Sequence, residues 1–480
     1  MVSSLAARAN SLPLPEEVAN VLRLRHTKPA FYMLCGYLLA QAFQIPLVAI
    51  GPSWALWPTM SDLLAGALIF LFATDRRSFR IVSRANSSIL RRLSLICCAT
   101  FAMLLAAYGS DLLKSGGSDT RAGNFGVFQL YRLVQFTLIF RIAAGIPITS
   151  RRLSMLSFSV GTALLVVIAG LAGTYSSLLQ TRRLVSHLPS DFSAAGPWAY
   201  LANTHLPDVG AIGYNHAYTA LQIIMLAALY LALQTRQSRA LVVICLLISL
   251  GGVFLTGSRA GMAAMIFLLA AYFIRRPSTL AVAGGLSVLL LLGSGVIVSR
   301  LGIDVSHTLA RQLTLSEPLD PGNLSGRQDI WKECLKLLEE DPVRWVIGSG
   351  PGSATELGSN AHMLFLHILL EGGLVGLLIF GLAAYTFIGH LHQEKSRAGP
   401  LLWATTALLI SSLTQETFYP VPAFGHFLGL YLCSIAIILN PIQRATVRGR
   451  QPNAGDNRSS VLQLGADAGG RDKIGVRPNL

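Results

Sequence analysis

The chain has 480 residues, of which 52% are hydrophobic and only 13% are charged. Soluble domains carry about 25% charged residues, so this chain lacks the polar surface that a water-soluble fold of its length requires. The composition therefore excludes a soluble enzyme, a disulfide-stabilised scaffold and an intrinsically disordered chain.

Uncharged apolar runs recur along the chain, and a helix of about 20 residues spans the hydrocarbon core of a bilayer. The sequence therefore predicts an all-α polytopic integral membrane protein with about 12 transmembrane helices. We expect the spans at Ala30–Ile50, Trp54–Ala73, Leu93–Gly109, Phe125–Ile146, Leu153–Tyr175, Ala211–Leu233, Ala240–Leu255, Ala260–Ile274, Thr279–Val298, His362–Ile388, Leu401–Leu413 and Val421–Leu439.

The basic residues predict the topology. With the N-terminus in the cytoplasm, the cytoplasmic segments hold 25 of the 38 Lys and Arg residues and the outer segments hold 11. Positive residues favour the cytoplasmic side, so we expect both termini there. The formal net charge of +15 then reflects topology and does not indicate a nucleic-acid partner.

The segments outside the spans complete the predicted organisation. The N-terminal segment lacks the apolar stretch of a cleavable signal peptide, so the first span is expected to be an uncleaved anchor. The predicted parts are a cytoplasmic segment (1–29), transmembrane helices 1–9 (30–298), a periplasmic loop (299–361), transmembrane helices 10–12 (362–440) and a disordered cytoplasmic tail (441–480).

The long outer loop contains one amphipathic segment, which begins at Ser325 and ends before Asp341-Pro342. Its apolar residues share one face at helical spacing: Ile330, Trp331, Cys334, Leu335 and Leu338. We expect this segment to form a helix that lies on the bilayer surface.

Arg259 lies in a tight outer turn between two short predicted spans, with Gly257 and Gly261 on either side. Ionisable groups at membrane depth are costly, and glycines permit a close approach of the backbone to a ligand. Arg259 is therefore a candidate ligand contact. The alternative is an anchor that extends from a helix end to the interface.

Arg327 is expected at the start of the amphipathic loop helix. The free N–H groups of a helix N-terminus bind anions, and an arginine there adds a bidentate phosphate donor. The alternative is a solvated surface arginine.

Three ionisable residues share one predicted span, namely His362, His367 and Glu371. His367 and Glu371 are four residues apart, so they face the same way and can neutralise each other. His362 stands at the outer end, where a neutral imidazole can act as a general base. The alternative is an interfacial or packed histidine. Gly372, Gly373 and Gly376 predict a close helix-packing seam.

The remaining candidates are weaker. His216 is expected at the outer end of the sixth span, and Asp62 and Arg132 are expected to form a structural ion pair, with a substrate path as the alternative. The outer loops hold no Asp-x-Asp motif and no His or Cys cluster with metal-ligand spacing, so we expect neither a metal nor another cofactor. Arginines and histidines at the outer face, without metal ligands, point to a lipid that carries a pyrophosphate group.

These residues lie in motifs that resemble the bacterial O-antigen ligase and polymerase superfamily. The motifs are Thr256-Gly-Ser-Arg259, Leu324-Ser-Gly-Arg-Gln-Asp-Ile-Trp331, Ile347-Gly-Ser-Gly-Pro-Gly352 and Ala361-His-Met-Leu-Phe-Leu-His-Ile-Leu-Leu-Glu-Gly-Gly-Leu-Val-Gly376, with Gly213-Tyr-Asn-His216 as a looser match. Their order and spacing agree over roughly residues 200–390. The chain departs from the family at Met363, where the family usually has Asn.

The resemblance implies a GT-C-like fold and a metal-independent, inverting glycosyltransferase at the periplasmic face of the bacterial inner membrane. The donor would be an undecaprenyl-diphosphate-linked glycan, held through Arg259 and Arg327, with His216, His367 and Glu371 as further substrate-binding candidates. His362 would deprotonate or orient the acceptor hydroxyl. Other polysaccharide assembly proteins are expected partners.

The acceptor separates the alternatives. The first hypothesis is a polymerase of exopolysaccharide or O-antigen repeat units, and the second is a ligase that transfers finished glycan to lipid A–core. A lipid-linked oligosaccharide flippase is the third, and the clustering of the candidate residues on the outer side argues against it, because alternating access usually uses a midplane site.

Overall fold

The computed structural model describes residues 23–43, 47–48, 58–115, 121–175, 216–234, 238–274, 281, 284–285, 306–316, 327–354, 361–419 and 427–443. The chain divides into two compact units, Met1–Gln443 and Arg444–Leu480, and all of these residues belong to the first. That unit is mostly helical, which agrees with the predicted all-α class.

Several of the described helices have the length and composition of membrane spans. Four are long and apolar enough to cross a bilayer, and they cover Arg84–Ala106, Gly126–Gly145, Ser150–Gly173 and Leu364–Gln393. Shorter apolar helices cover Met60–Thr74, Ala217–Leu233, Ala240–Leu255, Arg259–Phe273 and Phe427–Ile438. The described part of the chain is therefore that of a multi-pass membrane protein.

The helices follow the predicted spans with shifted ends. The first half contains α3 (Lys28–Ala40), α4 (Met60–Thr74), the short 3₁₀ helix η2 (Arg76–Ser78), α5 (Arg84–Ser115), α6 (Arg121–Gly145) and α7 (Ser150–Tyr175). The middle contains α11 (His216–Leu233), α12 (Arg239–Leu255), α13 (Arg259–Phe273), α15 (Ser306–Leu313) and the 3₁₀ helix η3 (Thr314–Ser316). The last part contains α16 (Arg327–Glu339), α17 (Pro342–Ile347), α18 (Leu364–Gln393), α19 (Lys395–Ser411) and α20 (Phe427–Ile438).

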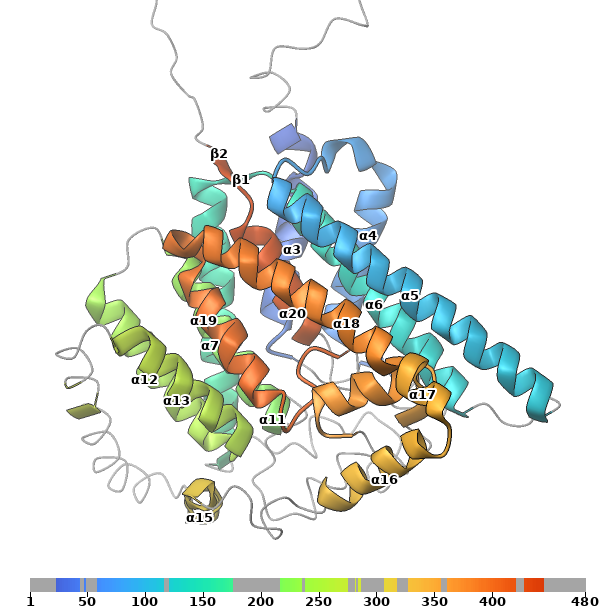
Figure 1. Ribbon diagram of the computed structural model, residues 1–480. Helices are drawn as coiled ribbons and strands as arrows, with labels where there is room; N and C mark the ends of the chain where they lie inside the picture. Colours follow the sequence, from blue (N-terminus) through green and yellow to red (C-terminus); the bar gives the residue numbers. More distant parts are fainter. Residues whose placement is uncertain are drawn as a thin grey trace, which may run out of the picture. The chain divides into compact units, whose positions relative to one another are not determined.

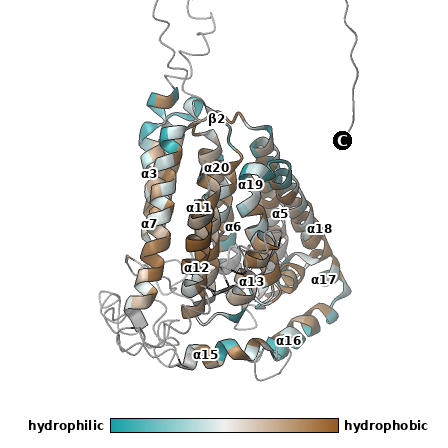
Figure 2. Cartoon of the chain, turned by 90° about the vertical axis from the view of Figure 1, so that its left-hand side faces the viewer, coloured by the Kyte–Doolittle hydropathy of each residue, from teal (hydrophilic) through white to brown (hydrophobic). Residues whose placement is uncertain are grey.

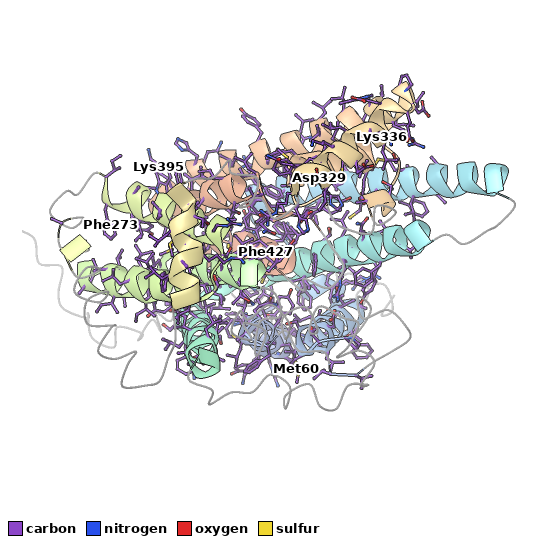
Figure 3. The ribbon with its side chains drawn as sticks, turned by 90° about the horizontal axis from the view of Figure 1, so that it is seen from below. Met60, Phe273, Asp329, Lys336, Lys395 and Phe427 are labelled. Atoms are coloured by element: carbon purple, nitrogen blue, oxygen red, sulfur yellow. The ribbon has the colours of Figure 1, made fainter. Side chains whose placement is uncertain are left out.

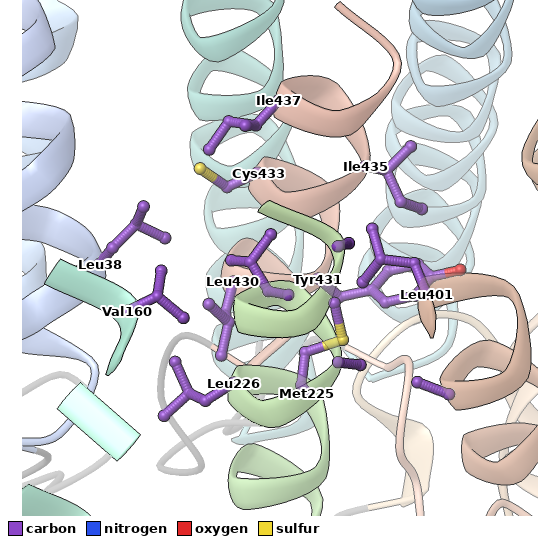
Figure 4. Packing of buried hydrophobic residues seen from close by; sticks show 14 of the residues in the cluster. Leu38, Val160, Met225, Leu226, Leu401, Leu430, Tyr431, Cys433, Ile435 and Ile437 are labelled. Carbon is purple, nitrogen blue, oxygen red and sulfur yellow. The ribbon is translucent and has the colours of Figure 1, made fainter. Parts of the chain in front are cut away.

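The core lies around α11 and α20. Every residue of α20 is buried, as are nearly all residues of α11, because both helices are apolar on all sides and other helices surround them. Figure 4 shows Met225 and Leu226 of α11 near Leu430 and Tyr431 of α20, with Leu401 of α19 beside them.

Two short strands pair at one end of the helices. β1 (Ile148–Thr149) and β2 (Ile442–Gln443) are parallel, and Ile148 is opposite Ile442. In Figures 1 and 2 this pair lies at the top, whereas α15 and α16 lie at the opposite end.

The helices α15 and α16 form a layer across that opposite end (Figure 2). In the view from below, α15 crosses α12 and α13, and Asp329 and Lys336 mark α16 (Figure 3). Asp341 caps α17, since its side chain accepts the N–H of Val343 at 2.9 Å, while Pro342 begins that helix. The predicted stop at Asp341-Pro342 is therefore confirmed.

The position of the loop helix at the bilayer surface stays a prediction, but protein covers part of its apolar face. The apolar face of α16 packs against the protein, where Cys334 and Leu338 are fully buried against Leu366 and Leu370 of α18. Leu335, expected on the same face, is exposed. The nearby surface of α18 offers apolar area, so the amphipathic helix buries Cys334 and Leu338 there.

Several expectations lie outside the described residues. These are most of residues 1–29, the outer segment Ser176–Gly210, nearly all of the span Thr279–Val298, the start of the span Val421–Leu439, the Gly213-Tyr-Asn part of the looser motif and the tail beyond Gln443.

Candidate functional site

The first arginine of the site stands at a tight turn between α12 and α13. Gly257 adopts a positive φ of 65°, which allows the chain to reverse, and the Ser258 side chain then accepts the N–H of Gly261 at 3.1 Å. Arg259 is thereby the first residue of α13. Gly261 packs so closely against Ala220 of α11 that a Cβ would collide. Gly257 therefore permits the turn, Gly261 permits the close packing against α11, and Arg259 lies at the N-terminus of α13.

Two further arginines lie near Arg259. Arg311 of α15 donates from Nε to the carbonyl of Gly257 at 3.0 Å, and Arg259 donates from Nη1 to Oγ1 of Thr314 at 3.0 Å. Arg327 begins α16, as the sequence predicted. Arg311 and Arg327 are close enough for their positive charges to repel that of Arg259. A concentration of positive charge of this kind favours an anion.

A sharp kink in α18 forms the second part of the site. Gly373 has a positive φ of 60° inside the helix, so the helical hydrogen bonding is interrupted there. The turn before α18 supplies hydrogen bonds beside this kink. The N–H groups of Ser349 and Gly350 donate to the carbonyls of Leu370 and Glu371 at 2.8 and 3.0 Å.

The glycine-rich turn therefore packs against the kink. A Cβ on Gly348 would collide with the main chain of Glu371, and a Cβ on Gly373 would collide with the main chain of Val346. The predicted helix-packing seam is confirmed at Gly373, where an added Cβ would collide with Val346 of α17, and at Gly372, where it would meet Met103 of α5 at 3.7 Å. At Gly376 the nearest atoms belong to Ile368 of the same helix.

Glu371 is a buried carboxylate with several donors. The N–H of Gly352 donates to its Oε1 at 2.9 Å, and the hydroxyl of Tyr419 donates to Oε2. Gln129 of α6 also approaches Oε1, at 3.5 Å. Burial, followed by the charge of Glu371, raises the pKa of Tyr419 well above its usual value, so this hydroxyl keeps its proton.

His367 lies between two carboxylates. Its Nε2 is 3.2 Å from Oε1 of Glu371, as the spacing of four residues predicted, and its Nδ1 is 3.7 Å from Oε1 of Glu416. All three side chains are at most 2% exposed. His367 therefore joins Glu371, on its own helix, to Glu416 in the loop after α19.

His362 precedes α18 and is not part of it, since the helix begins at Leu364. Its φ is +52°, its main-chain N–H donates to Oε1 of Glu416, and its Nδ1 lies 3.9 Å from Oε2 of the same carboxylate. Burial lowers the pKa of His362 below its usual 6.5; Glu416 opposes this effect, while Arg327 and His367 add to it. A neutral imidazole at pH 7 follows.

The structure thus brings most of the predicted site residues together. Arg259 and Arg327 interact electrostatically, Arg327 also interacts with His362, and His362 and His367 share Glu416. His216 begins α11, but its side chain lies outside the described part.

The pair of Asp62 and Arg132 is a separate ion pair with side chains 10% and 7% exposed, joined to the cap residue Thr59 and to Gln135. The predicted ion pair is confirmed.

Three residues of the candidate site were not predicted from the sequence. Glu416 is the one acidic residue between the last two predicted spans. An isolated ionisable residue beside membrane spans indicates a functional site, so the sequence could have predicted it. Tyr419 gave no signal of its own. Arg311 lies on the amphipathic helix α15, Ser306–Leu313, within the long outer loop, where no helix was predicted.

An apolar cavity lies beside Glu371. Residues of α5, α6, α18, α19 and α20 line it, and Gln129, Glu371 and Tyr419 contribute polar groups to its wall. Glu371 therefore lies at the edge of a cavity that is lined mainly by hydrocarbon side chains.

Part of the chain matches a known protein family. Residues 244–381 match the family model described as O-Antigen ligase. No curated protein matches the chain. The matched residues include Arg259, Arg311, Arg327, His362 and Glu371, and they end before Glu416. The match confirms the resemblance to the O-antigen ligase and polymerase superfamily, and it supports a membrane enzyme that processes glycans.

Proposed function

Starting from this family assignment, we propose that the chain is a membrane glycosyltransferase that transfers a glycan from undecaprenyl diphosphate to a sugar hydroxyl. The observation that carries the proposal is the grouping of Arg259 with Arg311 and Arg327, together with the interaction of Arg327 with His362. A diphosphate is the anion that several guanidinium groups bind well, and the adjacent base is what a hydroxyl acceptor requires.

The proposed reaction is a single displacement. The acceptor oxygen attacks the anomeric carbon while the bond from that carbon to the diphosphate oxygen breaks, so the configuration inverts. The acceptor proton passes to the neutral imidazole of His362, and the bonding electron pair leaves with the diphosphate. Because negative charge grows on the diphosphate in the transition state, preorganised arginines stabilise the transition state more than the ground state.

The apolar cavity beside Glu371 is consistent with a lipid-linked donor. Its walls are hydrocarbon side chains of helices that have the composition of membrane spans. A donor with a long hydrocarbon chain can therefore approach the polar site from within the bilayer.

We propose an inner-membrane topology with both termini in the cytoplasm and the site at the periplasmic face. The excess of Lys and Arg in the segments assigned to the cytoplasm supports this orientation. The β1–β2 pair and the α15–α16 layer lie at opposite ends of the helices (Figure 2), as this topology requires. Labelling of single cysteines at exposed positions near β2 and on α16 tests it, because a membrane-impermeant reagent must reach only α16 in intact cells.

We propose repeat-unit polymerisation as the specific activity, with transfer to lipid A–core as the alternative. The two share the donor and differ in the acceptor. A deletion strain that accumulates lipid-linked single repeats supports the polymerase, whereas long lipid-linked chains with an unmodified core support the ligase.

The deciding experiment uses the purified protein in proteoliposomes with a lipid-linked oligosaccharide donor and a sugar acceptor. New glycosidic bonds with inverted anomeric configuration and release of undecaprenyl diphosphate are expected. Transbilayer movement of the donor without any new glycosidic bond would instead indicate a flippase and would overturn the proposal.

A further inference from the structure

We propose that Glu416 is the positioning residue for His362: its carboxylate holds both the main chain and the imidazole in the orientation that accepts the acceptor proton. This inference rests on the proposed role of His362 as the base. Glu416 itself touches no reacting atom, so it acts through His362.

The first step of the argument is the main-chain conformation of His362. Among the described residues, His362 is the one non-glycine residue with a positive φ. That conformation is strained for a residue with a Cβ and persists where the surrounding structure holds it. The holding contact is the hydrogen bond from the His362 N–H to Oε1 of Glu416. The next residue, Met363, caps α18 without a side-chain hydrogen bond, so it supplies no such hold.

The second step is the orientation of the ring. The other carboxylate oxygen of Glu416, Oε2, lies 3.9 Å from Nδ1 of His362. A carboxylate on this side favours the tautomer with its hydrogen on Nδ1, which leaves Nε2 as the proton acceptor. It also stabilises the imidazolium that forms when Nε2 takes the proton.

The third step is the support of Glu416. The loop that carries it is tied to α18, since the N–H of Leu364 donates to the carbonyl of Ser412 at 3.0 Å. Burial raises the pKa of Glu416, but its contacts with His367 and His362 outweigh burial and hold the pKa below its usual value. His367 in turn contacts Glu371. Glu416 is therefore ionised and fixed.

The other groups that face this pair come from three helices. Arg327 and Cys334 of α16 and His367 of α18 interact electrostatically with His362 or Glu416, and the Tyr218 hydroxyl of α11 lies 3.4 Å from the carbonyl of Glu416. Arg327 and His367 favour the neutral imidazole, whereas Glu416 favours the protonated one. Removal of the Glu416 charge therefore leaves only groups that favour neutral His362.

The first test does not depend on activity. Diethyl pyrocarbonate modifies neutral imidazole, so the pH midpoint of His362 modification, followed by mass spectrometry of its peptide, reports the protonation of this ring. In Glu416→Gln we expect the midpoint to fall by about 1 pH unit, because an opposite charge at this distance is lost. The control Glu339→Gln changes an exposed carboxylate on α16 and leaves the midpoint unchanged.

The second test separates kcat from donor binding. In Glu416→Gln the amide oxygen still accepts the His362 N–H, so we expect a wild-type dissociation constant for the donor and a kcat about 10- to 100-fold lower. The acidic limb of the pH profile moves to lower pH. Glu416→Ala, which also loses the main-chain contact, has a lower kcat than Glu416→Gln.

The outcomes separate this inference from the proposed function. If wild-type protein forms no glycosidic bond, the proposed function fails, while the modification midpoint still decides whether Glu416 acts on His362. If wild-type protein is active and Glu416→Gln keeps the wild-type midpoint, pH profile and kcat, the inference is overturned. Should Glu416→Ala fail to fold, Glu416→Gln alone carries the test.

Discussion

The N–H of Gly352 donates a 2.9 Å hydrogen bond to Oε1 of Glu371, which couples the glycine-rich turn after α17 to the kinked helix α18. Gly352 has a φ of +90°, and the kink at Gly373 lies two residues beyond Glu371. The turn and the kink therefore form one unit, and Glu371 links this unit to His367. Each part of the proposed active site then depends on the conformation of the other.

Gly373→Ala tests the kink. A Cβ at this position meets the main chain of Val346, and φ is +60°, so overpacking and backbone strain together lower the free energy of unfolding by about 2–4 kcal/mol. Thermal unfolding in detergent measures the loss. Gly381→Ala is the matched control, because it lies on the same helix with nothing within 4 Å of the added Cβ. Equal stability of the two variants would contradict the close packing.

Arg259→Ala, Arg311→Ala and Arg327→Ala test the proposed diphosphate site. A hydrogen bond to a charged group contributes about 1.5–3 kcal/mol, so each variant should raise the donor dissociation constant by about 10- to 100-fold and also lower kcat. Equilibrium binding of the lipid-linked donor measures the first effect. Lys336→Ala removes an exposed positive charge from the same helix as Arg327, and its binding should remain that of the wild type.

His362→Ala should lower the rate of transfer, whereas His367→Ala should lower the stability of the protein. Loss of the proposed general base lowers single-turnover rates by about 10²–10⁴-fold and leaves donor binding nearly unchanged. His367 is fully buried between Glu371 and Glu416, so its loss leaves two carboxylates facing each other and reduces stability. A stable His367→Ala protein without activity, together with an active His362→Ala protein, would show that the base is His367.

The pH dependence follows from the lowered pKa of His362. A base must be neutral, and a lowered pKa keeps the imidazole neutral as the pH falls from 7 toward 6.5. The acidic limb of kcat/KM should therefore have its midpoint below pH 6.5, the usual value for histidine. A midpoint above pH 7 is inconsistent with the buried setting of His362.

Divalent metal should be unnecessary, because arginines take the role of stabilising the leaving diphosphate in the proposed mechanism. Treatment with EDTA followed by gel filtration should leave the rate of transfer unchanged. Strong inhibition that magnesium reverses would require a different account of the diphosphate site.

The sequence by itself determined the class of the protein and the local parts of the site. Apolar runs without charge predict membrane helices wherever they occur, and the helical period places His367 and Glu371 on one face, which the structure confirms at 3.2 Å. The start of α16 at Arg327 and the turn at Gly257 are likewise consequences of local chain chemistry. These features depend on residues within a few positions of one another, so spacing alone reveals them.

Only the tertiary structure decided how these parts meet. Glu416 lies 54 residues after His362 and reaches it because α19 reverses the chain. Arg311 reaches the turn that carries Arg259 because α15 packs across α12 and α13. The apolar face of α16 packs against α18 in the folded structure. From its amphipathic pattern alone, this face was expected to contact lipid. A periodic pattern states that a face must be covered, but the surface that covers it is selected by the folded arrangement of distant helices.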